Sequence, residues 1–130
     1  MPRKLTLAMI ATCLIGCASV PSSKALELSS VISDPAMYDG QHITVAACIN
    51  VIIHGVALLP CGERRPNVDI KAPENRGAEY SRLVSYAHKN MGASPEELPV
   101  LVVGRFMAAQ STGDVLHSIA VEKFQPWQDQ

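Results

Sequence analysis

Apolar and polar residues alternate along two stretches in the middle of the chain, which is the pattern of half-buried β-strands. In residues 41–51 every odd position from 43 onward is apolar, whereas the even positions are mostly polar or small. Residues 67–71 alternate in the same way, and an apolar run at 56–60 lies between the two stretches. Because every second side chain of a strand points to the same face, these stretches predict three strands. His54-Gly55 suits a turn between the first two of them.

The period then changes to that of a helix between residues 75 and 91. The apolar residues of this segment fall on one helical stripe, which contains Tyr80, Leu83, Val84, Ala87 and Met91. Two further strands are expected at 100–108, where Gly104 is a candidate bulge, and at 117–124. The order is therefore three strands, one helix and two strands.

This order matches a small Greek-key barrel, the OB-fold, in which a helix lies between the third and fourth of five strands. Residues 34–45, with a Tyr38-Asp39-Gly40 turn before an alternating strand, also resemble the start of small OB-like domains in exported bacterial proteins. The sequence predicts a mainly β fold with one helix, built as a five-stranded OB-like barrel. An open antiparallel sheet with one packed helix fits the same pattern.

The beginning of the chain has the features of a signal peptide. Arg3 and Lys4 form a short basic start, and a mainly apolar run follows at 5–15. A helix that spans a bilayer needs about 20 apolar residues, so this run is too short to be a membrane span. Its length is that of the apolar region of a signal peptide, which is removed from the mature protein.

The junction Leu14-Ile15-Gly16-Cys17 resembles the lipobox of bacterial lipoproteins. The resemblance implies that the leader is cut before Cys17 and that the cysteine thiol carries a lipid, with acyl chains that anchor the protein to a membrane. It divides the chain into a signal peptide (1–16), an acylated cysteine with a flexible tether (17–28) and an OB-like domain (29–127). Ala18, rather than Asp, follows the cysteine, which implies the outer membrane of a Gram-negative envelope, facing the periplasm. A signal peptide cut elsewhere would leave Cys17 without this role.

Cys48 and Cys61 are the cysteines that remain once Cys13 leaves with the leader and Cys17 is acylated. Because the periplasm is oxidising, we expect a structural disulfide between them across the first hairpin. A bridge that closes a loop of this length stabilises a fold by about 3 kcal/mol in the chain-entropy model. A metal site made by the two cysteines and His54 is the alternative, but the spacing matches no standard zinc pattern. No metal or other cofactor is expected.

Charge and aromatic content exclude one class of partner. Removal of residues 1–16 takes away Arg3 and Lys4 and no acid, which leaves 9 basic and 12 acidic residues and a net charge of −3. Aromatic residues make up 5% of the chain. Neither value suits binding to nucleic acid, which depends on basic residues for the phosphates and on aromatic side chains for stacking.

Candidate binding residues come from the OB-like reading, because the ligand face of that fold is built on the second and third strands and nearby loops. Here this face and the adjoining loop contain Arg64, Arg65, Asn67, Asp69 and Lys71. The chain has four histidines, and none of them has a catalytic partner at a spacing typical of an active site. The sequence also contains no Gly-x-Ser-x-Gly motif.

The sequence therefore predicts a lipid-anchored envelope protein that binds a partner protein or a small ligand without catalysis. An accessory hydrolytic enzyme that uses a histidine, and a structural envelope protein, are the alternatives. An enzyme is expected to gather a histidine with a carboxylate or serine in a concave site, whereas a binding module is expected to have dispersed histidines.

Overall fold

The structure is a computed structural model and describes residues 25–52, 55–64, 66–74, 77–91, 98–110 and 116–127. Its elements in chain order are β1 (Leu26–Glu27), α1 (Leu28–Ser33), α2 (Pro35–Tyr38), β2 (His42–Ile52), β3 (Gly55–Leu59), β4 (Val68–Lys71), α3 (Ala78–Met91), β5 (Leu98–Met107) and β6 (Ser118–Pro126). No helix among these residues is long and apolar enough to cross a membrane.

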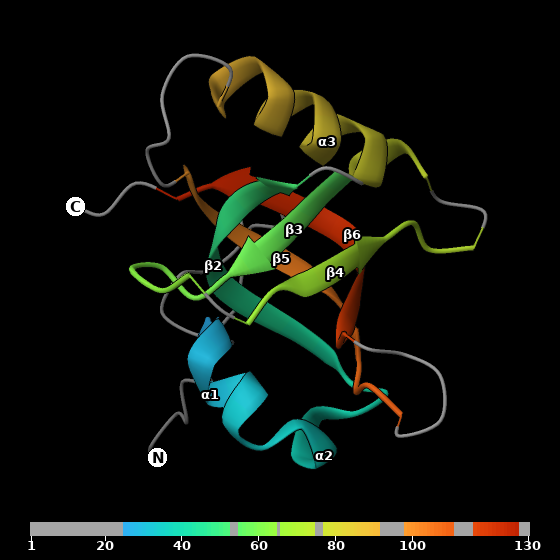
Figure 1. Ribbon diagram of the computed structural model, residues 1–130. Helices are drawn as coiled ribbons and strands as arrows, with labels where there is room; N and C mark the ends of the chain where they lie inside the picture. The colour runs from blue at the N-terminus through green and yellow to red at the C-terminus, as the bar shows by residue number, and fades with distance from the viewer. Residues whose placement is uncertain are drawn as a thin grey trace, which may run out of the picture.

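All of these strands belong to one mixed sheet with the order β1-β2-β3-β4-β6-β5, and β2 also pairs with β5 (Figure 1). The pairings of β2 to β6 thus return to β2 and curl the sheet into a barrel-like ring. The pairing around the ring is shortest between β3 and β4, where two residues of each strand are paired. The ring is therefore partly open between these two strands. The prediction of a mainly β fold with one main helix is confirmed, and the parallel pairing of β4 with β6 makes the sheet mixed.

The interior of the ring is filled by the apolar positions of the alternating strands. Ile43, Val45, Ala47 and Ile49 of β2 are buried in one cluster with apolar residues of all the longer strands. Leu83 and Ala87 enter the same cluster from α3, and Leu28 and Val31 enter it from α1. Figure 1 shows α3 across one end of the sheet and α1 with α2 at the opposite end.

Residues 26–28, which the predicted boundaries place in the tether, are part of this fold. Leu26 pairs with Val45 and Glu27 with Ala46, in parallel. Leu28 is buried in the core. Residues 26–28 therefore belong to the folded domain and not to the tether.

Gly104 is required by a close approach between β5 and β6. The register of the two strands shifts between Val103 and Gly104, as expected from the candidate bulge. A Cβ atom at Gly104 would press against the carbonyl oxygen of Ala120 and lie 2.8 Å from Cγ2 of Ile119. The backbone oxygen belongs to a paired strand and has little room to move.

We expect Gly104→Ala to lower the free energy of unfolding by about 1–3 kcal/mol, which is typical of a methyl group forced into a packed interior. Urea unfolding followed by circular dichroism measures this loss. Gly77→Ala is the matched control, because a Cβ there meets no atom within 4 Å. Equal stabilities of the two variants would contradict the role given to Gly104.

Arg82 attaches α3 to the last strand. Its guanidinium lies 4.1 Å from the centre of the Phe124 ring and donates a hydrogen bond of 2.9 Å to the Phe124 carbonyl. The same group donates two hydrogen bonds to Glu79, one helical turn earlier. These hydrogen bonds from Arg82 hold the pKa of Glu79 below its ordinary value.

The lowered pKa of Glu79 gives a small pH-dependent stabilisation with a defined sign. The contribution is present above the pKa of Glu79 in the unfolded chain and is lost as the pH falls through the lower folded value. Because the pair is exposed, we expect Glu79→Gln to cost about 0.3–0.5 kcal/mol at pH 7 and nothing near pH 2. Urea unfolding at both pH values measures the difference, and a cost that persists in acid would contradict this account.

Candidate functional site

The predicted disulfide is present and closes the turn after β3. Cys48 and Cys61 are bonded, with their Cα atoms 5.0 Å apart. The confirmed bridge leaves neither sulfur as a free thiolate, so the alternative metal site does not form from these cysteines; His54 lies outside the described residues. The two cysteines are not directly opposite, because Cys48 pairs with Leu59.

The loop after Leu59 turns back so that Cys61 meets Cys48. The N–H of Glu63 donates a hydrogen bond of 3.1 Å to the carbonyl of Pro60. Gly62 has φ +86°, a left-handed conformation that a residue with a side chain adopts at a cost. The bridge and this turn together fix the loop against the middle of β2.

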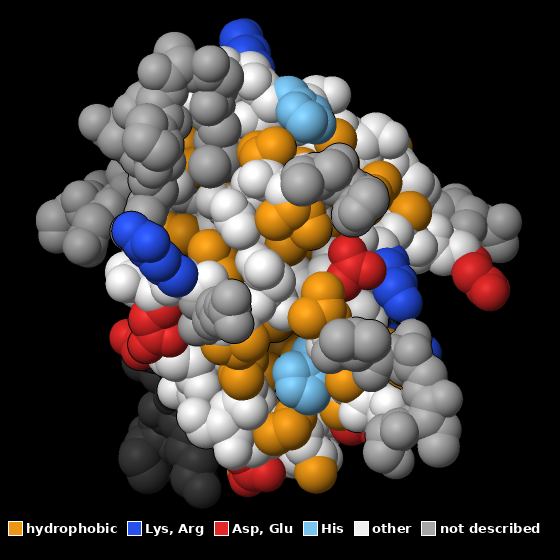
Figure 2. Space-filling model, in the orientation of Figure 1, with side chains coloured by type: hydrophobic (Ala, Val, Ile, Leu, Met, Phe, Trp, Pro, Cys, Tyr) orange, Lys and Arg blue, Asp and Glu red, His pale blue; other side chains and the backbone are white. Residues whose placement is uncertain are grey.

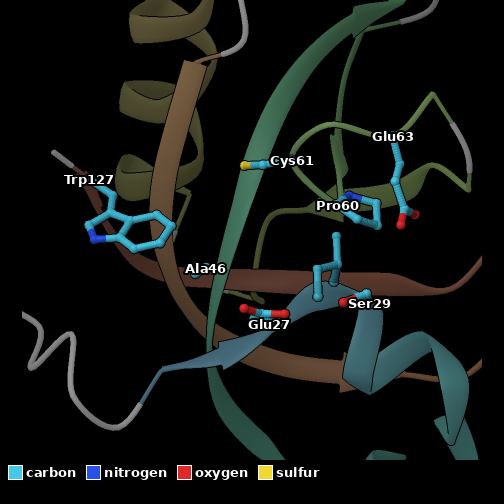
Figure 3. Close-up of a pocket in the computed structure, with 8 residues that line it drawn as sticks. Glu27, Ser29, Ala46, Pro60, Cys61, Glu63 and Trp127 are labelled. Carbon is cyan, nitrogen blue, oxygen red and sulfur yellow. The ribbon is translucent and has the colours of Figure 1, made fainter. Parts of the chain in front are cut away.

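A groove with a volume of about 340 Å³ lies beside this loop, on the outer side of the sheet (Figure 3). Four segments that are far apart in the sequence form it, and its lining residues are Glu27, Leu28, Ser29, Ala46, Pro60, Cys61, Glu63 and Trp127. Figure 3 shows Trp127 on one side of β2 and Pro60 with Glu63 on the other, with Ala46 and Cys61 between them.

Each wall of the groove is held by the backbone of the sheet. Ala46 pairs with Glu27 on one side and with Leu101 on the other, and its small side chain leaves the centre hollow. Trp127 follows the last residue of β6, and its N–H donates a hydrogen bond of 3.1 Å to the carbonyl of Pro99 in β5. The groove is therefore formed in advance, as binding sites for small groups usually are.

The chemistry of the groove is apolar in the middle and acidic at its edges. Leu28 and Pro60 are buried, and Trp127 is half-buried. Glu27 and Glu63 are exposed carboxylates, and the lining residues that the structure describes include no Lys, Arg or His. Such a surface favours a ligand that is neutral or positively charged over an anionic one.

Those residues predicted to bind a ligand that the structure describes lie elsewhere and do not line this groove. Arg64 is exposed in the loop, and Arg65 lies outside the described residues. Asn67 accepts a hydrogen bond of 3.0 Å from Asn50 across the outer face. Asp69 and Lys71 alternate with core residues along β4, so they share that outer face. Ligand binding at these residues stays a prediction.

The described histidines lie in separate environments. His42 Nδ1 is 2.7 Å from a carboxylate oxygen of Glu122, and both side chains are substantially exposed. His117 is half-buried, and its Nδ1 accepts a hydrogen bond of 2.7 Å from the N–H of Ala109. His88 is exposed near the end of α3. In the part of the chain that the structure describes, no group of three His, Cys, Asp or Glu residues is placed to hold a metal ion.

Sequence reasoning missed the groove because its residues share no local pattern. Glu27 to Ser29 lie at the predicted boundary between the tether and the domain, and Trp127 is the last residue of the predicted domain. The one available signal was that Trp127 is the single tryptophan of the chain and follows the last strand directly. No family model matches this chain, and neither the curated proteins nor the solved structures contain a match.

Proposed function

We propose that this chain is a lipid-anchored lipoprotein of the bacterial envelope and acts as a non-enzymatic binding module. The groove at Ala46 and Trp127 is the observation that carries the binding role. It is concave, it is walled by paired strands and by the disulfide-closed loop, and it combines an apolar centre with a few polar groups. The ligand is a partner protein or a small molecule that presents a neutral or positively charged group.

The anchor is proposed on the sequence Leu14-Ile15-Gly16-Cys17, with the outer membrane facing the periplasm as its location. The Cys48–Cys61 disulfide supports an oxidising compartment, because disulfides persist there and are rare in the cytosol.

Mass spectrometry of the protein from the membrane fraction tests the anchor. The expected N-terminal peptide begins at Cys17 and carries a diacylglycerol, and Cys17→Ser is expected to move the protein to the soluble fraction. An unmodified N-terminus at Ala18 or beyond would refute the anchor.

Site-specific photo-crosslinking in intact cells tests the binding role. A photoreactive residue at Glu63 lies at the edge of the groove, and one at the exposed Ser85 of α3 is the control. We expect a specific adduct from position 63 alone, and we expect Ala46→Leu to abolish it because leucine fills the hollow centre. Adducts of equal yield from both positions, or an adduct unaffected by Ala46→Leu, would count against the groove.

A hydrolytic enzyme is the second candidate, and the His42–Glu122 pair is the observation that favours it. A carboxylate that accepts a hydrogen bond from a histidine orients the ring for general-base chemistry. The pair is exposed and does not line the groove, so the binding module remains our proposal. His42→Asn separates the two: an enzyme would lose its activity, whereas the adduct from position 63 is expected to be unchanged.

A further inference from the structure

Three of the four large apolar side chains exposed in the described residues belong to segments joined at one end of the domain. Met37, Met107 and Leu116 are 61%, 42% and 40% exposed, respectively. We call these three residues the apolar end. The fourth residue, Val51, belongs to β2 and pairs with Val56 of β3. Figure 1 shows these ends of β2 and β3 near α3.

Hydrogen bonds join the segments that carry the apolar end. The Met37 carbonyl accepts a hydrogen bond of 3.0 Å from the side chain of Gln41, and the Gln41 carbonyl accepts one of 2.9 Å from the N–H of Phe106, the neighbour of Met107. On the other side of Met107, the N–H of Ala108 donates one of 2.9 Å to the carboxylate of Asp39. The apolar end is therefore presented on fixed backbone.

The segment that carries Leu116 is tied to the same place. His117 follows Leu116, and its ring centre lies 5.5 Å from that of Phe106. Its Nδ1 accepts the hydrogen bond from Ala109. Figure 2 shows hydrophobic side chains gathered on the lower part of the front face. Figure 1 places α2 and the adjoining ends of β5 and β6 at this lower end.

We propose that the apolar end rests on the phospholipid surface to which Cys17 is anchored, a proposal that depends on the anchor proposed above. The chain enters the described domain at Ala25, only eight residues after Cys17. An extended chain covers at most about 3.3–3.6 Å per residue, so the segment spans less than about 30 Å. A domain of this size has a radius of gyration of about 13 Å, so the tether is no longer than the domain is wide.

A short tether makes a weak surface contact sufficient. It holds the domain at an effective concentration in the millimolar range beside the lipid, and a few apolar side chains then suffice to orient it. Methionine suits this contact because its side chain is apolar and adapts to an irregular surface. Asp34, Asp39 and Arg105 are all exposed at this end, and Arg105 donates a hydrogen bond to the carbonyl of Gly40. Because these charges are of mixed sign, the contact that we propose is apolar and does not depend on anionic headgroups.

Quenching of tryptophan fluorescence by brominated lipid tests the contact. The acylated full-length protein, with Trp127→Phe to remove its single tryptophan, receives one tryptophan as Met37→Trp or Met107→Trp, or as Val51→Trp for the control. The vesicles contain phosphatidylcholine, alone or mixed with phosphatidylglycerol, and each composition is made with and without brominated acyl chains. Side chains at an interface lie about 5–10 Å into the headgroup region, so we expect positions 37 and 107 to lose about half of their fluorescence. We expect no loss at position 51.

The outcomes separate this proposal from the anchor on which it rests. Acylated Cys17 with equal quenching at the three positions, or with none, overturns the membrane contact alone. If no position is quenched and the protein has twice its monomer mass in detergent, the apolar end contacts a second copy of the chain. This result also overturns the membrane contact. Quenching that requires phosphatidylglycerol shows an electrostatic contact and contradicts the apolar one. An unacylated Cys17 removes the anchor and this proposal together.

Discussion

Phe106→Ala is expected to lower the free energy of unfolding by about 3–5 kcal/mol, the range measured when a buried aromatic side chain is truncated. Phe106 is fully buried in the core formed by the ring of strands. Its ring also packs against the ring of His117, whose Nδ1 accepts a hydrogen bond from the N–H of Ala109. The substitution therefore leaves a cavity and removes the ring against which His117 packs.

Met107→Ala is the matched control, because Met107 is the next residue and points to the opposite face of β5. Its side chain is exposed, and exposed substitutions usually change stability by less than about 0.5 kcal/mol. Urea unfolding of both variants without lipid, followed by circular dichroism, measures the two effects. If the two variants lost similar amounts of unfolding free energy, the loss would not depend on burial of the Phe106 side chain, and this account would be wrong.

Sequence periodicity located the longer elements because each of them buries one face in the same core. The alternation in 41–51 predicted β2, and the stripe through Leu83 and Ala87 predicted α3. β1 was not predicted because two residues carry no period, and its pairing with Val45 and Ala46 depends on the folded sheet. The number of cysteines left after removal of the leader predicted the disulfide. Its geometry was not predicted, because Cys48 pairs with Leu59 and the turn after β3 brings Cys61 back to Cys48.

The groove could not be predicted from local sequence patterns. It joins Glu27 to Trp127 across β2, and the pairings of β2 with β1 and β5 bring these residues together. The small side chain of Ala46 creates the hollow, yet in the sequence it is one of several small residues in an alternating strand. A site of this kind follows from the order of the strands in the sheet, which neighbouring residues do not specify.

Loss of the Cys48–Cys61 bridge is expected to lower the free energy of unfolding by about 3 kcal/mol, because the unfolded chain regains the freedom of the closed loop. We expect the same loss from the double variant Cys48→Ala/Cys61→Ala and from the wild-type protein in reducing agent. Trp127, as the single tryptophan, reports unfolding at the groove by its fluorescence, and far-ultraviolet circular dichroism reports unfolding of the sheet.

Reducing agent is expected to leave the double variant unchanged, which separates loss of the bridge from a general effect of the reagent. The bridge also fixes Pro60 to Glu63 against β2, so its loss removes one wall of the groove while β1 and Trp127 remain paired to the sheet. In cells, we therefore expect the photo-crosslink from position 63 to disappear in the double variant under conditions where circular dichroism still shows a folded protein. An unchanged adduct would mean that the ligand contacts this loop without depending on the shape that the disulfide gives it.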